Sequence, residues 1–227
     1  MKIGATASRS GVHAARTPVL ACALVVAMLA LPVTAVGQLK SAPPRPLHVA
    51  FDGAVKKSRM TWLSKAPLET IRGTTGPVAG NVKFDPRRLS TLRGKLRTPV
   101  ARMKSGNDIR DKHLHGPRWL DARRWPHIHY TITSAKVRKT KGTKARLSVR
   151  GQLTVRGKTV SVPAEVQLRW IAAGPKTQRV PGHWVKVKLK LAVKLADFGI
   201  TGVGGIVGSK VAPVIAIEGS LYGHTVR

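Results

Sequence analysis

Two histidine pairs are the side chains whose spacing could bind a metal ion. They are His113 with His115 and His127 with His129, and one residue separates the members of each pair. On a β-strand such a pair projects from one face, as two metal ligands can. Apolar residues alternate with the second pair and occupy the buried face, so these imidazoles should point to solvent. With few carboxylates to complete a shell, the sequence predicts no functional metal site.

Catalytic arrangements are equally weak. Asp108 and Asp111 are three residues apart and could share a helix face, but nothing around them would separate their pKa values for acid and base roles. No serine lies in a nucleophile elbow. The glycine-rich stretch at 202–210 lacks the spacing of a phosphate loop and favours a flexible hairpin loop. The sequence therefore predicts a protein that is not an enzyme.

Charge is the strongest feature of the composition. The chain has 227 residues, with 41 Lys and Arg against 9 Asp and Glu, a formal charge of +32. The cations recur at 87–88, 123–124, 138–146 and 186–194, which predicts an extended positive surface. Such a surface fits an anionic membrane or an acidic envelope polymer, whereas nucleic acid is disfavoured because few aromatic residues could stack on bases. An equally weighted alternative to binding at an anionic surface is that the charge only keeps the protein in solution.

The N-terminal segment is typical of an export signal. Basic residues precede the apolar run Val19–Leu31, which is shorter than the roughly 20 residues of a membrane-spanning helix. Cleavage near Gly37 would remove residues 1–37, including Cys22, the single cysteine, and leave a chain without disulfides. We therefore expect a periplasmic or secreted protein. Residues 38–54 are expected to form a linker and domain lead-in, with an extended linker at Ser41–Pro46 and the fold beginning near Leu47, and residues 55–223 are expected to form the barrel domain.

From Tyr130 onward the apolar residues recur with a period of two, which is the period of a β-strand. In the run 185–195 every odd position is apolar, and most even positions are lysine. Arg156–Lys158 joins two further runs as a hairpin turn. The remaining runs with this pattern are Ile128–Ile132, Leu147–Val155, Val160–Trp170 and Ile215–Leu221. One face of an antiparallel sheet should therefore be apolar and the other polar.

Upstream segments complete the count of strands. Arg59–Leu63, Gly76–Phe84 and Leu92–Met103 have a weaker alternation, which brings the total to about eight. An antiparallel sheet of that size can close into a barrel wide enough for one small ligand. Residues 106–122 lack alternation and predict a short helix with turns packed across the barrel. The sequence predicts an all-β fold with a short helical insertion.

The inward-facing side chains are the candidate ligand-lining residues. If the barrel is hollow they line a cavity, and if it is filled they form a plain core. Tyr130, Trp170 and Phe198 are the aromatic candidates to stack on a ligand ring. The full candidate set is Tyr130, Ile132, Leu147, Val149, Leu153, Val155, Val162, Val166, Leu168, Trp170, Val187, Leu189, Leu191, Phe198, Ile215 and Ile217.

Several ordered motifs resemble those of the YceI-like family. They are Ile109–Leu114, Trp119–Ala122, Trp125–Ile128, Val78–Pro86, Gly151–Thr159 and Asp197–Ile200, and together they extend the resemblance from about Val55 to Tyr222. The residues of this chain that match positions of the family's motifs are Arg110, Asp111, His113, Leu114, Trp119, Leu120, Asp121, Pro126, Asp197, Phe198 and Gly199.

The resemblance implies an exported, lipocalin-like β-barrel that binds a polyisoprenoid or an isoprenoid quinone, without another cofactor and without catalysis. In this setting Trp119 and Leu120 would form a lid or anchor the helix, and Arg110 with Asp111 would form a charge pair that fixes the helix or meets a quinone carbonyl. A basic surface-binding protein that uses the barrel only as a scaffold is the competing class. The sequence leaves open whether two chains pair as a homodimer.

Overall fold

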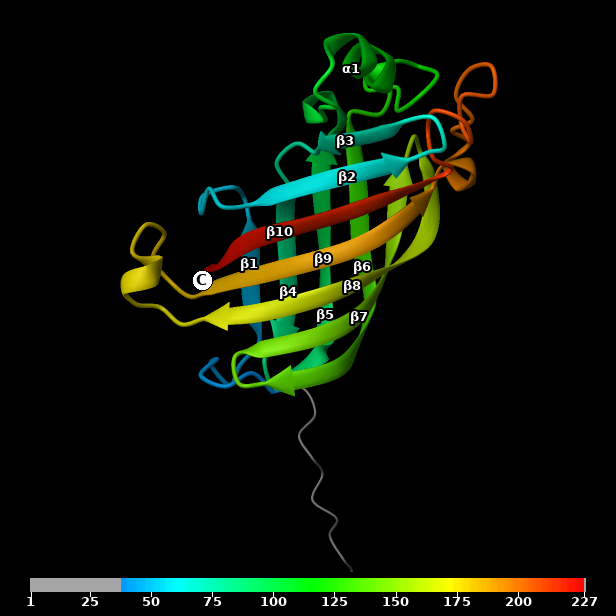
Figure 1. The fold of residues 1–227 in the computed structure, drawn as a ribbon. Helices are drawn as coiled ribbons and strands as arrows, with labels where there is room; N and C mark the ends of the chain where they lie inside the picture. The colour runs from blue at the N-terminus through cyan, green and yellow to red at the C-terminus, as the bar shows by residue number, and fades with distance from the viewer. Residues whose placement is uncertain (1–37, 227) are drawn as a thin grey trace, which may run out of the picture. The chain divides into compact units, whose positions relative to one another are not determined.

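The structure, a computed structural model, describes residues 38–226, so the expected signal peptide at 1–37 lies outside the described residues. This part is built on antiparallel strands (Figure 1). The strands are β1 (Leu47–Phe51), β2 (Arg59–Lys65), β3 (Thr70–Thr74), β4 (Ala79–Asp85), β5 (Arg88–Pro99), β6 (His127–Lys141), β7 (Lys144–Val155), β8 (Lys158–Ile171), β9 (Trp184–Lys194) and β10 (Val214–Val226).

Short helices lie between some of these strands. They are α1 (Asp108–His115) and the 3-10 helices η1 (Val100–Arg102), η2 (Pro175–Thr177) and η3 (Leu195–Phe198). Within residues 38–226, none of them is both long enough and apolar enough to span a membrane.

Pairing between β1 and β10 closes eight of the strands into a ring, in the order β1-β4-β5-β6-β7-β8-β9-β10. One edge of β10 serves two partners: His224–Val226 pair with β1, and Ala216–Ser220 pair with β2. β3 continues outward from β2, and β8, β9, β10 and β2 cross in front of β4, β5 and β6 at a steep angle (Figure 1). The fold is a closed, antiparallel, lipocalin-like barrel, which confirms the predicted fold class.

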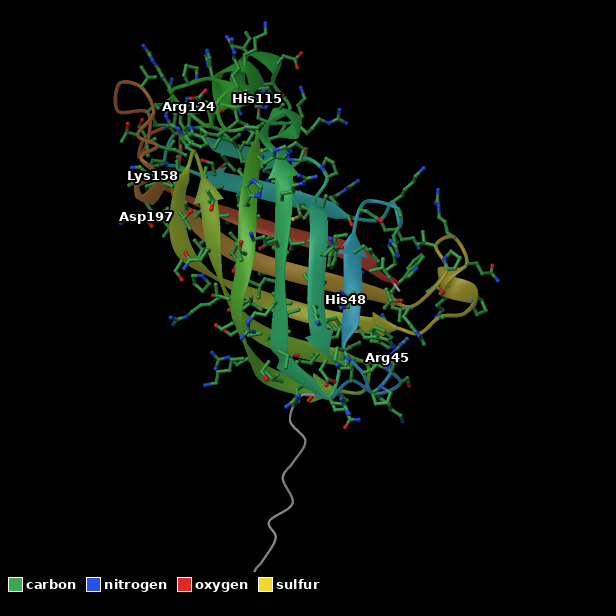
Figure 2. The ribbon with its side chains drawn as sticks, turned by 180° about the vertical axis from the view of Figure 1, so that it is seen from behind. Arg45, His48, His115, Arg124, Lys158 and Asp197 are labelled. Carbon is green, nitrogen blue, oxygen red and sulfur yellow. The ribbon has the colours of Figure 1, made fainter. Side chains whose placement is uncertain are left out.

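The two ends of the barrel carry different connections. One end, which we call the mouth, carries residues 66–69, 100–126 and 195–213 and the β7–β8 turn. The other end, which we call the base, carries residues 38–46 and the β4–β5 and β6–β7 turns. Figure 2 shows His115, Arg124, Lys158 and Asp197 at the mouth and Arg45 near the base, with His48 above it on β1.

The strands predicted from the period of two agree with β6 to β10. The predicted hairpin is also present, because Arg156 and Gly157 join β7 to β8 with φ angles of 50° and 72°. Both lie in the left-handed region, as a two-residue turn between antiparallel strands requires. The helical insertion expected within 106–122 contains α1.

The structure differs from the expectations near the N-terminus. The fold begins at Leu47 as expected, but there it forms β1, which pairs with β10, so the barrel itself begins before the expected boundary at residue 55. β10 likewise continues to Val226, beyond the expected boundary at 223. β3 was not predicted, and the strand expected to reach Met103 ends at Pro99, where η1 begins. The missed strands have five residues each, too few to establish a period.

Tyr130 and Gly151 form a tight contact inside the barrel wall. The hydroxyl of Tyr130 donates a hydrogen bond of 2.8 Å to the carbonyl of Val162 on β8. To reach it, the ring crosses Gly151 on β7, and a β-carbon at this glycine would lie 2.4 Å from the ring carbon Cζ. Burial raises the pKa of Tyr130 to about 12, so the hydroxyl remains a donor at neutral pH.

We predict that Gly151→Ala lowers the free energy of unfolding by about 1–3 kcal/mol, because the added methyl group must displace the Tyr130 ring. Urea denaturation measures this change. Gly174→Ala is the matched control, since a β-carbon there meets no atom within 4 Å, and it should cost less than about 0.5 kcal/mol. Equal stability of the two variants would contradict the proposed contact.

Candidate ligand-binding cavity

The larger apolar cavity lies at the mouth and has a volume of about 430 Å³. Strands β2, β3, β6, β7, β9 and β10 supply one part of its wall, and α1, the β2–β3 turn and the two long mouth connections supply the rest. The exposed residues Ile109 and Lys210 also belong to this wall, so the cavity reaches the surface. Its apolar lining is Trp62, Ile71, Met103, Ile109, Leu114, Trp119, Leu120, Ile128, Leu153, Val155, Val193, Leu195, Ile200, Ile206, Val211, Ile215 and Ile217.

A second cavity of about 150 Å³ lies deeper in the barrel and is almost entirely apolar. Met103, Ile128, Leu153 and Ile217 line both cavities, so the two adjoin. Together they provide a continuous stretch of apolar wall, and we call the two cavities the chamber. This lining suits a flexible apolar chain, because burial of the chain's surface contributes about 25 cal/mol per Å².

The polar side chains of the larger cavity include Glu69, Asn107, Arg110, His113 and Lys210, which come from mouth connections and α1. The Arg110 guanidinium bonds the Glu69 carboxylate at 2.6 Å and so ties α1 to the β2–β3 turn. Arg110 therefore pairs with Glu69, and not with Asp111 as the sequence suggested. The polar side chains are therefore concentrated at the mouth, and the deeper cavity remains apolar.

Helix α1 is fixed by a cap and a buried carboxylate. The Asn107 side chain accepts a bond of 3.0 Å from the backbone N–H of Arg110. Asp111 accepts bonds of 2.6 and 2.7 Å from the backbone N–H and the hydroxyl of Ser105, and the Lys104 ammonium lies 3.4 Å away. Burial alone would raise the pKa of Asp111, but these donors outweigh it and hold that pKa below its ordinary value.

The base is closed by side chains of the chain itself. Leu39 is buried in the same core cluster as Phe84 and Trp170, and its backbone N–H donates to the carbonyl of Pro86 at 3.0 Å. The indole N–H of Trp170 donates to the Ser41 carbonyl at 3.2 Å. Residues that the sequence placed in a linker therefore plug this end, and the mouth is the accessible end of the chamber.

Most of the predicted lining residues lie on a cavity wall; that they contact a ligand remains a prediction. Leu153, Val155, Ile215 and Ile217 line the larger cavity. Tyr130, Ile132, Val149, Leu153, Val166, Leu168, Val187, Leu189, Leu191 and Ile217 line the deeper one.

Four predicted lining residues lie on neither wall. Leu147, Val162, Trp170 and Phe198 are buried in the packed core. Trp170 stacks on His183 at 4.8 Å near the base, and Phe198 is buried in η3. Of the three aromatic candidates to stack on a ligand, only Tyr130 lines a cavity. The period of two identified the inner face correctly but could not show at which height the barrel is filled.

The family-motif residues divide into wall residues and residues of the mouth framework. Arg110, His113, Leu114, Trp119 and Leu120 line the larger cavity, while Asp111, Asp121, Pro126, Asp197, Phe198 and Gly199 do not. Gly199, with φ of 68°, ends η3, and the Pro126 carbonyl accepts from the backbone N–H of Val100. Asp121 adopts a left-handed φ of 50° in the turns after α1. Asp197 is exposed.

Sequence reasoning missed several wall residues, among them Trp62, Ile71, Met103, Ile200, Ile206 and Val211. Met60, Trp62 and Ser64 do alternate within β2, and this short signal could have identified Trp62. The others come from the short strand β3, from the residue that follows η1 and from loops, where the side chains do not alternate between two faces. Their positions follow only from the closed fold.

The histidine pairs do not form a metal site in the part of the chain that the structure describes, where no three His, Cys, Asp or Glu side chains gather. The rings of His127 and His129 are 6.0 Å apart, and His129 is exposed. Burial, with the cations around it, lowers the pKa of His129. His115 Nε2 instead donates to the Met103 carbonyl at 2.9 Å and so fixes the end of α1.

The positive surface includes a dense patch that we call the basic band: Lys139, Lys141, Lys144, Arg146, Arg169, Lys186 and Lys188. Lys141, Lys144, Arg169 and Lys186 are direct cross-strand neighbours in one row over β6 to β9. Like charges in such positions repel, and no carboxylate lines the groove of about 450 Å³ beside them. The band lies toward the base, away from the mouth.

We predict that Asp111→Asn destabilises the protein by about 1–3 kcal/mol at neutral pH, since Asn cannot replace a carboxylate held by charge-assisted bonds. Because the folded-state pKa of Asp111 is lowered, its contribution is present above the unfolded-state pKa near 4 and is lost as pH falls through the folded value. Urea unfolding at neutral pH and near pH 3 measures the free energy of unfolding of both proteins. The difference in that free energy between wild type and Asp111→Asn should be smaller at the lower pH. A difference independent of pH would contradict this role.

The fold and the chamber define a class: small antiparallel barrels that enclose an apolar cavity open at one end. Comparison with known families is specific, because the YceI-like domain family matches residues 51–221. The chain belongs to the YceI-like family. Its relatives include the protein YceI of Salmonella arizonae, which is 28% identical over 149 residues, covering 66% of this chain and 73% of that protein.

Solved structures share the fold at low sequence identity. BcnA of Burkholderia cenocepacia has a TM-score of 0.59 and 22% identity, covering 74% of this chain and 97% of that one. The YceI protein of Campylobacter jejuni has a TM-score of 0.58 and 16% identity, covering 72% and 89%. A polyisoprenoid binding domain from Saccharophagus degradans has a TM-score of 0.57 and 11% identity, covering 80% and 100%.

Proposed function

We propose that this protein binds the apolar chain of a polyisoprenoid or an isoprenoid quinone in its barrel, and carries or sequesters that lipid without catalysis. The observation that carries the proposal is the pair of adjoining apolar cavities, which share the wall residues Met103, Ile128, Leu153 and Ile217, with polar groups gathered at the mouth. An isoprenoid tail would occupy the deeper chamber, and its polar head would remain near Glu69 and Arg110.

The family supports this proposal. The Saccharophagus domain with the same fold is described as polyisoprenoid binding, and this chain belongs to the YceI-like family. The proposed setting is the periplasm or the exterior of the cell, in line with the export signal expected at residues 1–37. A carrier there would hold a lipid that has almost no solubility in water.

A second function is favoured by the basic band, whose cations have no neighbouring carboxylate in their groove. In that case the protein would bind an anionic surface, and the barrel would serve only as a scaffold. The two functions predict different contents for the purified protein, because only the first requires a lipid inside the barrel.

The first experiment is purification in high salt from a host that makes isoprenoid lipids, followed by solvent extraction and mass spectrometry. High salt removes lipids held only by charge. We expect a polyprenyl or quinone mass in nearly equimolar amount with the protein. An empty extract from folded protein, repeated after incubation with added ubiquinone, would contradict the carrier function and favour the surface-binding one.

We also predict that Ile217→Trp fills apolar volume at the wall shared by the two cavities and lowers the bound isoprenoid at least about tenfold, equivalent to 1.4 kcal/mol. Quantified solvent extracts measure this loss. Ile217→Val is the matched control, which adds no volume at this wall and should retain the lipid. A thermal unfolding scan of each variant separates a blocked chamber from an unfolded one; retained lipid in folded Ile217→Trp would show that the chamber is not the binding site.

A further inference from the structure

Exposed apolar side chains gather at the mouth of the barrel. The large hydrophobic residues exposed in the described part of the chain are Leu68, Ile109, Val203, Val214 and Val226. Three of them belong to separate mouth segments: Leu68 in the β2–β3 turn is 71% exposed, Ile109 in α1 is 67% exposed and Val203 before β10 is 45% exposed. Such a group rimmed by polar residues is typical of an interaction surface.

Direct contacts connect these three segments around the cavity. The backbone N–H of Leu68 donates to the Ser209 carbonyl at 3.1 Å, which joins the β2–β3 turn to the segment that carries Val203. The Glu69–Arg110 ion pair joins the same turn to α1, beside Ile109. Leu68 adjoins the wall residue Glu69, Ile109 is itself a wall residue, and Val203 bonds through its carbonyl to the wall residue Ile206. The exposed side chains of Leu68, Ile109 and Val203, which we call the apolar tips, therefore border one opening.

The charges around this opening favour an anionic partner. The mouth connections 66–69, 100–126 and 195–213 contain eight Lys and Arg and five Asp and Glu. Two of the five carboxylates, those of Glu69 and Asp111, are held by Arg110 and Lys104. Lys112, Arg118, Arg123, Arg124 and Lys210 are exposed. Apolar tips among exposed cations are what an interfacial contact with an anionic bilayer requires.

We propose that the mouth docks on a bilayer containing anionic phospholipid, with Leu68, Ile109 and Val203 entering the interface. This inference rests on the proposed lipid-carrying function and adds the surface from which the lipid is taken. Once docked, the opening faces hydrocarbon, and an isoprenoid chain moves between bilayer and chamber without exposing its length to water. That exposure would otherwise oppose transfer by about 25 cal/mol for each Å².

The basic band would attract the same bilayer by a different mechanism. None of the exposed large hydrophobic residues belongs to the band, so attachment through it rests on charge and is screened by salt. Attachment through the band would also leave the mouth away from the membrane, because the band lies toward the base. High salt therefore separates the two docking modes.

The test is sedimentation of the protein with vesicles of phosphatidylcholine and phosphatidylglycerol in about 0.5 M salt, where the Debye length falls to a few ångströms. The double variant Leu68→Gln with Val203→Gln should bind at least about tenfold more weakly than wild type, since burial of each side chain contributes more than 1 kcal/mol. Val226→Gln, at the base end of β10, is the matched control and should bind as wild type does.

A second measurement separates docking from lipid binding. Uptake of ubiquinone from the same vesicles should slow about tenfold in the double variant, while its binding from detergent should stay within about twofold of wild type. Equal vesicle binding by the double variant and the control would overturn the inference, as would loss of binding only in Lys144→Gln with Lys186→Gln. Failure of the wild type to bind ubiquinone from detergent would instead count against the carrier function, whatever the vesicles show.

Discussion

The edge of β10 is shared between two strands, and the rest of the molecule depends on this division. Near the base, β10 pairs with β1 and the ring closes; toward the mouth, it pairs with β2, and β3 extends the sheet outward. The ring is therefore closed by β1 near the base, while the hairpin of β2 and β3 forms the wall toward the mouth. Trp62 and Ile71 reach the larger cavity because this hairpin stands there.

The same division separates the packed core from the chamber. At the base, Leu39, Phe84 and Trp170 fill the space that the strands enclose, and backbone groups of residues 39–41 complete their hydrogen bonds. At the mouth, α1 and the long connections cover the opening and do not fill it, since they are held by polar contacts such as Glu69 with Arg110. The polar framework keeps the cover in place while leaving apolar volume beneath it.

The sequence predicted the parts of this arrangement that repeat. Alternation located β6 to β10 and the inner face of each, because burial of one face leaves a period of two in residues such as those of 185–195. It could not locate β1 or β3, which are short, nor predict that Trp170 lies in a filled region and Leu153 beside a cavity. The height of a residue along the barrel depends on the stagger between strands and on the loops. The two-residue alternation of apolar side chains contains no information about either. The ion pair of Glu69 with Arg110 joins residues 41 positions apart, so only the closed fold brings them together.

Closure by the first and last strands also sets a condition on folding time. His48 pairs with Val226, so the ring cannot form until almost the whole domain has been synthesised. Contacts between residues so far apart in sequence form slowly, and until then β1 and β10 present unpaired edges that other chains can join. The high positive charge opposes such association, because chains of like charge repel one another and therefore resist aggregation before the ring closes.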